Sequence, residues 1–342
     1  MRKLGRNSPT EKGGVATPGQ GWGLCLNQRK RNLSRSMTSA MAFSLFGTLS
    51  GKTVNKTVKT LRAIALVSAL GGSLVLLPGC FGKAPVEPVS GQELLDKSKV
   101  AKGEAFTYDD YAEVLTTYVN DQGLVDYDGL LANREGLDRF NADLAAVSRE
   151  TYEGWSEPAQ IAFWMNAYNS LTLQAIIDNY PVDSIRGING VWSDIKFTVL
   201  GEPMTLNDIE HEVLRKDFNE PRLHMAIVCA SIGCPVLRTE PFVAEKLDEQ
   251  LKEQTVEFLK HDRNFTLDKD ANEVGVSSIF KWFGEDFETT YGPDSGFEGH
   301  NDTDRSVLNF IAQHLEEGDR EYLEGSKYRF KHLDYDWGIN AQ

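Results

Sequence analysis

The sequence predicts an α+β fold, a single mixed domain of several helices packed on a small, mostly antiparallel sheet. Long segments with apolar residues three and four positions apart predict helices, and short alternating or continuous apolar segments predict strands. The helices come before, between and after the strands, without the regular strand–helix alternation of a parallel sheet. The 263 residues from position 80 onward are enough for one sizeable core.

Helical spacing predicts two helices near the start of this domain and a longer one that Pro181 ends. Thr205 and Asp208 fit a capping box that opens a further helix. Pro241 fits the first position of another major helix. The predicted helices are 108–119, 130–147, 157–180, 205–215, 241–262 and 305–315.

The strands are predicted from shorter patterns. Residues 195–206 read as a hairpin with Gly201 and Glu202 at its turn, and FTLD with EVGVS reads as a second hairpin. LHMAIVCA, residues 223–230, is a nearly continuous apolar run and predicts a buried strand. The alternating tail KYRFKHLDYDW predicts a closing strand.

The first 79 residues differ in composition from the rest. They hold 12 Lys or Arg and one acid, whereas residues 80–342 hold 24 basic and 49 acidic residues. Four basic residues from Lys52 to Arg62 precede the apolar run AIALVSALGGSLVLL, which has the length of a signal-peptide core. We therefore predict that 1–79 is a signal segment with an over-extended start; the alternative is an uncleaved anchor.

The end of that run, LLPGC, resembles the lipobox of bacterial lipoproteins. The resemblance implies cleavage before Cys80 and attachment of fatty acyl chains, palmitate among them, to that cysteine. Residues 80–104 are expected to be the lipidated cysteine and a tether, and 105–342 the α+β domain. The expected location is the cell envelope, facing the periplasm. Phe81 favours outer-membrane sorting if the organism is Gram-negative.

The acidic balance of residues 80–342 argues against nucleic acid, whose phosphates would be repelled. The expected contact with the membrane is through the lipid on Cys80, and a protein or small-molecule partner stays unidentified. No phosphate-binding glycine loop and no common metalloprotease motif occurs in the sequence. We expect no cofactor and no metal.

The helix around AFWMNAYNSLTL carries polar residues among apolar ones. Asn166, Asn169 and Ser170 share one arc of the helix, and buried amides cost about 1–3 kcal/mol each unless they are hydrogen-bonded. They either bond neighbouring backbone or line a polar pocket. His211 lies off the apolar stripe of its helix, so it is either a site residue or a boundary histidine paired with Asp208.

The stretch HMAIVCASIGCP holds His224, Cys229 and Cys234. In a straight strand His224 and Cys229 would face opposite sides, which leaves Cys234, in the loop beyond, as the candidate nucleophile. His211, His224, Arg215 and Arg238 could each promote its thiolate. The two cysteines could equally form a disulfide in an oxidising compartment. A zinc site is a further alternative, although the spacing matches no common one.

Five segments in order, AFWMNAYNSLTL, DIEHEVLR, RLHMAIVCASIGCPVL, SSIFKWFGEDF and YDWGIN, resemble the domain of unknown function 547 family over residues 159–340. In this sequence Ile232-Gly233 stands where relatives often have a more polar pair. The resemblance supplies no reaction. It implies that the following residues occupy motif positions: Asn166, Tyr168, Asn169, His211, Arg215, His224, Cys229, Cys234 and Pro235.

Three functions are compatible with these residues. The first is a non-catalytic envelope lipoprotein that binds a partner or ligand, with Cys229–Cys234 as a structural disulfide and Tyr168, Asn169 and Arg215 in the binding site. The second is a thiol-dependent hydrolase or acyl transferase. Cys234 would be the nucleophile, His224 or His211 the base, and Asn166 or Asn169 the orienting amide or oxyanion donor. The third is a metal-dependent activity.

Overall fold

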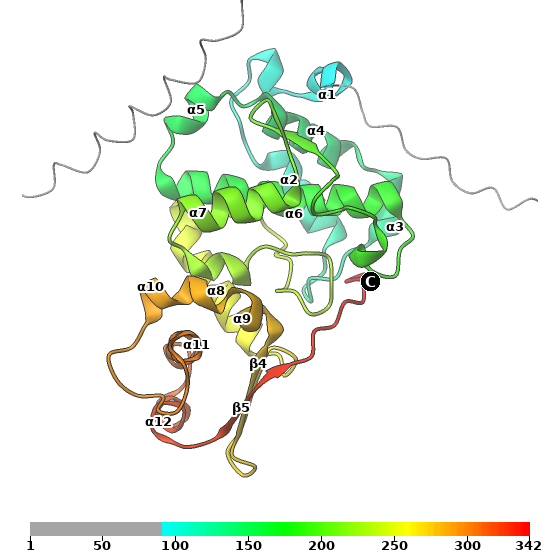
Figure 1. The fold of residues 1–342 in the computed structure, drawn as a ribbon. Coiled ribbons are helices and arrows are strands. Elements are labelled where there is room, and N and C mark those ends of the chain that lie inside the picture. Colours follow the sequence, from blue (N-terminus) through cyan, green and yellow to red (C-terminus); the bar gives the residue numbers. More distant parts are fainter. Residues whose placement is uncertain (1–90) are drawn as a thin grey trace, which may run out of the picture. The chain divides into compact units, whose positions relative to one another are not determined.

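The structure, a computed structural model, describes residues 91–342 (Figure 1). All described residues belong to one compact unit of the chain, which begins at Cys80. The expected signal segment, the lipidation site at Cys80 and the first part of the tether lie outside the described residues.

Helices make up most of the described residues, as expected for this α+β fold. A π-helix, η4, continues directly into α7. The α-helices are α1 Gly91–Lys97, α2 Asp109–Tyr118, α3 Tyr127–Ala132, α4 Glu135–Ala146, α5 Arg149–Glu153, α6 Glu157–Asn179, α7 Arg215–Asp217, α8 Leu247–Leu259, α9 Ser278–Phe283, α10 Glu288–Tyr291, α11 Asp302–Ala312 and α12 Glu317–Gly325. The others are η2 Val100–Lys102, η3 Ile185–Gly187, η4 Asp208–Leu214, η5 Pro221–Met225, η6 Ala244–Lys246 and η7 Gly284–Phe287.

The strands form two small sheets. β1 Phe197–Val199 and β2 Glu202–Met204 are an antiparallel hairpin. β3 Phe265–Asp268 and β4 Glu273–Ser277 pair antiparallel, and the C-terminal β5 Arg329–Leu333 adds to β4 in parallel. The mostly antiparallel sheet pairing predicted from the sequence is confirmed, including the closing strand.

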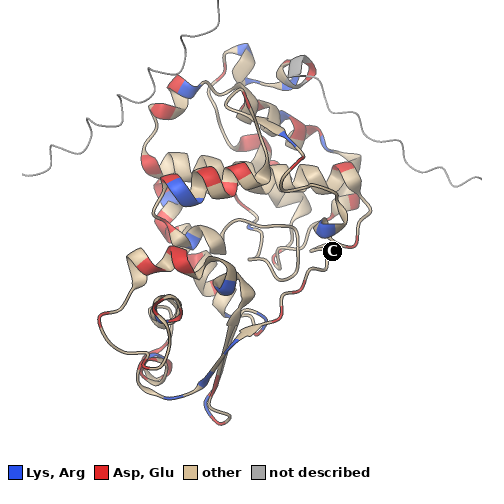
Figure 2. Ribbon diagram, in the orientation of Figure 1, with Lys and Arg blue, Asp and Glu red and all other residues tan. Residues whose placement is uncertain are grey.

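The long helix α6 forms the centre of the larger hydrophobic cluster. Helices α3 and α4 pack against it, and Figure 1 shows it crossing the middle of the described body. Sixteen of its 23 residues are buried, which agrees with its nearly all-round apolar sequence. A second cluster lies around the β3–β4–β5 sheet with α9 and α11. Acidic residues are spread over many helices (Figure 2).

Several predicted boundaries shift. The helix expected over 130–147 is two helices, α3 and α4, because Asn133 leaves helical geometry and its amide bonds the Gly129 carbonyl. The helix expected from Pro241 begins only at η6 and α8, because the backbone of Phe242 is bound to a side chain of α6. Helix α12 was not predicted.

The first hairpin turns one residue earlier than expected. Leu200 and Gly201, with φ of 52° and 76°, occupy the turn, as a two-residue turn of type I′ requires. A leucine adopts this conformation because its N–H and that of Gly201 bond the Leu144 and Ala145 carbonyls at the end of α4, each at 2.9 Å. This tertiary contact overrides the local preference that placed Glu202 in the turn.

The expected tether is shorter than 80–104. Residues within 91–102 form α1 and η2, and α1 packs against α4. Asp143 of α4 accepts hydrogen bonds from the Ser98 hydroxyl and from the Lys99 and Val100 backbone at 2.7, 2.7 and 3.0 Å. These residues therefore belong to the packed body.

The strand predicted over residues 223–230 is wrong. Residues 221–225 are the 3₁₀-helix η5, and the segment that follows is irregular, with Ala230 at a φ of 55°. The Asn169 side chain bonds two backbone groups of this segment, the Ala226 carbonyl and the Val228 N–H, in place of the partner strand that the apolar run seemed to require.

Within residues 91–342, no helix combines the length and the hydropathy that a membrane crossing needs.

Candidate functional site

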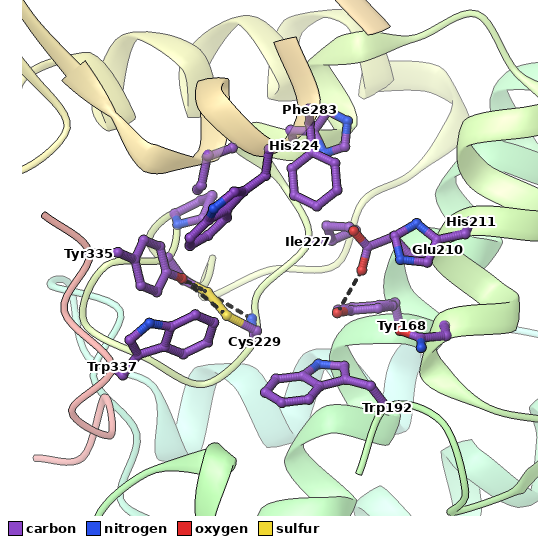
Figure 3. A pocket seen from close by; sticks show the side chains of 15 residues that line it. Tyr168, Trp192, Glu210, His211, His224, Ile227, Cys229, Phe283, Tyr335 and Trp337 are labelled. Atoms are coloured by element: carbon purple, nitrogen blue, oxygen red, sulfur yellow. Dashed lines mark hydrogen bonds between the residues drawn. A yellow bond between two sulfur atoms is a disulfide. The ribbon is translucent and has the colours of Figure 1, made fainter. Parts of the chain in front are cut away.

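A pocket of about 230 Å³ lies where residues of the two hydrophobic clusters meet (Figure 3). Its walls are mainly aromatic, with a few polar side chains that converge on it. Its lining comprises Tyr168, Trp192, Asn207, Glu210, His211, His224, Ile227, Cys229, Cys234, Pro235, Ile279, Trp282, Phe283, Tyr335 and Trp337. An apolar pocket with a few placed polar groups is the usual form of a small-molecule site.

Cys229 and Cys234 are paired as a disulfide in one wall of this pocket, with Cα atoms 6.2 Å apart. Donors surround the sulfur of Cys234: the Cys229 N–H at 2.8 Å and the Tyr335 hydroxyl at 3.0 Å. Burial raises the pKa of Tyr335 above its ordinary value, so the phenol keeps its proton and can donate. In the described chain, neither His211 nor His224 is hydrogen-bonded to either sulfur.

The C-terminal tail holds the disulfide loop in place. The N–H groups of Ile232 and Gly233 donate to the carbonyls of Gly338 and Asp336, both at 2.8 Å. A Cβ at Gly233 would lie 2.9 Å from the Tyr335 ring, so only glycine permits this approach. The close contact brings Tyr335 against the sulfurs.

We expect the disulfide to stabilise the fold by about 2 kcal/mol, the value that loop closure predicts for so short a loop. The Cys229→Ala/Cys234→Ala variant should therefore unfold at a lower urea concentration than the oxidised wild-type chain, and adding a reductant to the wild type should give a similar decrease. The variant itself should not respond to reductant. Identical midpoints for oxidised and reduced wild type would contradict the prediction.

The helix that carries Glu210 and His211 is the π-helix η4, and its N-terminal capping box is confirmed by reciprocal bonds between Thr205 and Asp208. π-Helical turns are rare and recur at functional sites. Two consecutive residues of η4, Glu210 and His211, both line the pocket. Tyr168 of α6 donates its hydroxyl proton to Glu210 Oε2 at 3.0 Å. Burial and the nearby Glu210 raise the pKa of Tyr168 well above its ordinary value.

Asp286 of η7 binds two of the candidate residues, Arg215 and His224. It accepts from Arg215 Nε and Nη2 at 2.6 and 2.9 Å and from His224 Nε2 at 2.7 Å. Burial alone would raise the pKa of Asp286, but the hydrogen bonds from His224 and Arg215 outweigh it and hold the pKa well below its usual range. The ring of His224 also stacks on Phe283, with centroids 4.4 Å apart.

The contact between Arg215 and His211 fixes the tautomer of the histidine. Arg215 Nη1 lies 3.0 Å from His211 Nδ1, and a guanidinium can only donate. Nδ1 must therefore accept, which places the proton of a neutral His211 on Nε2. The alternative pairing of His211 with Asp208 is wrong, because Asp208 caps the helix instead.

Asn166 and Asn169 do not line the pocket; each binds the backbone of a loop. Asn166 donates to the Phe242 carbonyl at 2.7 Å and accepts from its N–H at 3.0 Å. Asn169 donates to the Ala226 carbonyl at 3.1 Å and accepts from the Val228 N–H at 2.8 Å. Ser170 bonds the Ala167 carbonyl within α6. The interpretation that these side chains bond neighbouring backbone is therefore correct, and the one that they line a polar pocket is not. Neither amide is placed to orient a substrate.

The loss of the predicted strand changes the relation between His224 and Cys229. Without strand alternation, both residues line the same pocket. Of the residues predicted for the site, Tyr168, His211, His224, Cys229, Cys234 and Pro235 meet there. Arg215 lies behind it, bonded to His211 and Asp286. Within the described chain, no three His, Cys, Asp or Glu side chains form a group that could hold a metal ion.

Sequence reasoning missed Glu210, Asp286, Tyr335 and several aromatic walls of the pocket. Glu210 and Glu212 both flank His211 in the sequence, so the sequence alone did not show which of the two acids is buried. Asp286 lies 62 residues from His224 along the chain, so no local pattern links the two. Trp282 and Trp337 stack on each other at 5.8 Å across a similar separation.

The family comparison agrees with part of the predicted resemblance. No curated protein and no solved structure matches the chain. The resemblance predicted over 159–340 is supported up to residue 259. Over residues 152–259, which include η4 and the disulfide loop, the chain matches the family described as "Protein of unknown function, DUF547".

Proposed function

We propose that this chain is an extracytoplasmic lipoprotein, anchored through Cys80, that binds a small organic ligand without catalysis and uses Cys229–Cys234 as a structural disulfide. One observation carries the proposal: the disulfide forms a wall of a largely aromatic pocket. A disulfide sulfur has no thiolate to act as a nucleophile. A rigid wall keeps the pocket formed before the ligand arrives, which lowers the entropic cost of binding.

The size of the pocket limits its ligand. A cavity of about 230 Å³ is smaller than the roughly 300–1,000 Å³ of pockets that hold drug-sized ligands, so it suits a compact ligand. Trp192, Trp282 and Trp337 line it, and their fluorescence should report occupancy. The rings supply apolar contact area, and Asn207 and His211 supply polar contacts that fix orientation.

Benzyl alcohol, a neutral aromatic probe, tests whether the pocket binds ligands. With the full chain, we expect saturation-transfer NMR signals from benzyl alcohol and a change in tryptophan fluorescence on titration. The Asn207→Trp variant should fill the pocket and remove both effects. The proposal fails if the signals are equally strong in the wild type and in an Asn207→Trp variant that retains its fold by circular dichroism.

The anchor is supported by the LLPGC motif and is tested separately. In bacteria that express the full chain, radiolabelled palmitate should be incorporated and the protein should fractionate with membranes. The Cys80→Ala variant should lose the label. A labelled Cys80→Ala protein, or an unlabelled wild type, would overturn the lipoprotein assignment and leave the pocket proposal standing.

A second candidate function, a thiol-dependent hydrolase or acyl transferase, is favoured by the donors around Cys234. If the disulfide is reduced, the Cys229 N–H and the Tyr335 hydroxyl are placed to stabilise a Cys234 thiolate. His224, held by Asp286, or His211 would then be the base. Labelling of Cys234 by a thiol-reactive probe in native protein purified without reductant would favour this function.

A further inference from the structure

The pocket contains one carboxyl group that no cation of the described chain contacts. Glu210 is 7 % exposed and lines the pocket, and Tyr168 is its only hydrogen-bond donor in the described chain. The 15 residues that line the pocket include no Lys and no Arg. A carboxylate has about four sites that can accept, so a single phenol leaves most of them without a partner. A buried charge of this kind is costly unless it is paired.

The nearest cation does not provide the missing charge. Arg215 is bonded through two of its nitrogens to Asp286, which carries its own negative charge, and through the third to His211. Among the described residues, no Lys, Arg or His lies within ion-pair distance of Glu210. Arg215 is near enough for the Glu210 carboxylate to help raise its pKa, but the hydrogen bonds of its guanidinium go to Asp286 and His211, so no cation in this part of the chain is in contact with Glu210.

The remaining walls suit a cation. Trp282, Tyr335 and Trp337 form one aromatic group, with centroids 4.9 Å apart for Trp282–Tyr335 and 4.5 Å for Tyr335–Trp337. Trp192 contacts Trp337 at 6.1 Å. In Figure 3, Tyr335 and Trp337 lie on the side of the pocket opposite Glu210. Aromatic faces attract ammonium groups, and quaternary ammonium ligands are recognised by such groups of rings.

We propose that the pocket selects a small organic cation, an ammonium group on a compact body, with Glu210 as its counter-ion and the tryptophan and tyrosine rings around it. This proposal rests on the proposed function and names its ligand class. An anion would add to the uncompensated charge of Glu210, and a neutral ligand would leave that charge unpaired. The acidic composition of residues 80–342 favours the approach of cations.

Choline and its neutral isostere 3,3-dimethylbutan-1-ol are the matched probes, because they differ in charge and hardly in shape. Binding to the full chain is measured by calorimetry and by tryptophan fluorescence. We expect choline to bind at least ~tenfold more tightly than the isostere, and Glu210→Gln to weaken choline binding by at least ~tenfold. Glu212→Gln, a change at an exposed acid of the same helix, is the control and should leave choline binding unchanged.

The outcomes separate this inference from the proposed function. Equal binding of choline and the isostere, or undiminished choline binding by Glu210→Gln, would overturn the proposal that the ligand is a cation. The proposal that the pocket binds a small ligand would still stand. Absence of choline binding in a chain that binds benzyl alcohol would do the same. If none of the three probes binds, the proposed function fails as well. Circular dichroism of Glu210→Gln establishes that the variant is folded.

Discussion

Replacing Asn169 with Ala is expected to destabilise the fold by about 2–5 kcal/mol. The Asn169 amide makes two buried hydrogen bonds, to the Ala226 carbonyl and from the Val228 N–H, and the alanine would leave both backbone groups unpaired. Each buried unsatisfied group costs about 1–3 kcal/mol. Urea unfolding of the full chain, followed by circular dichroism, measures the change.

Asn179→Ala is the matched control. Asn179 lies at the exposed end of the same helix and makes one local bond, to the Ala175 carbonyl at 2.8 Å. Its replacement should change stability by no more than about 0.5 kcal/mol. Equal unfolding midpoints for the Asn169 and Asn179 variants would show that the loop after η5 does not depend on the amide.

Replacing Asp286 with Asn should destabilise the fold by about 2–4 kcal/mol at neutral pH, because it leaves Arg215 without its counter-ion in a half-buried position. The effect should depend on pH. The folded pKa of Asp286 is held below the ordinary value of about 4, so its contribution is complete above that value and decreases as the pH falls toward the folded pKa.

Urea unfolding at neutral pH and near pH ~3 tests this dependence. The difference in unfolding free energy between wild type and Asp286→Asn should shrink in acid. Asp270→Asn, at an exposed position in the β3–β4 turn, should show little difference at either pH. A wild-type advantage over Asp286→Asn that stays constant or grows in acid would contradict the assigned ion pair.

The helices that were predicted correctly have either a long stretch of helical apolar spacing or a recognisable helix cap in the sequence. Helix α6 and the capping box at Thr205 and Asp208 are local features, and their energetic reasons lie in neighbouring residues. The conformation of the apolar run 223–230, in contrast, does not depend on neighbouring residues. A short apolar segment fits a strand, a buried helix or a clamped loop equally well, and here the Asn169 side chain decides between them.

The pocket was predicted only in part, because its members come from distant segments. His211, His224 and the two cysteines were recognisable as chemically unusual residues in apolar surroundings. Their arrangement depends on Asp286 and on the tail with Tyr335, which contacts both cysteine sulfurs from about 100 residues away. A π-helix also displaces side chains from the α-helical positions on which the sequence reasoning relied.

The oxidation state of Cys229 and Cys234 tests the central claim most directly. Trypsin cleaves after Arg222 and Arg238, so one peptide, 223–238, holds both cysteines. The full chain is purified without reductant, denatured, alkylated and digested with trypsin. The mass of the peptide is then measured by mass spectrometry. We predict a peptide without alkyl groups and lighter by two hydrogens than the dithiol form. A doubly alkylated peptide would contradict the structural disulfide and favour a reactive thiol at Cys234.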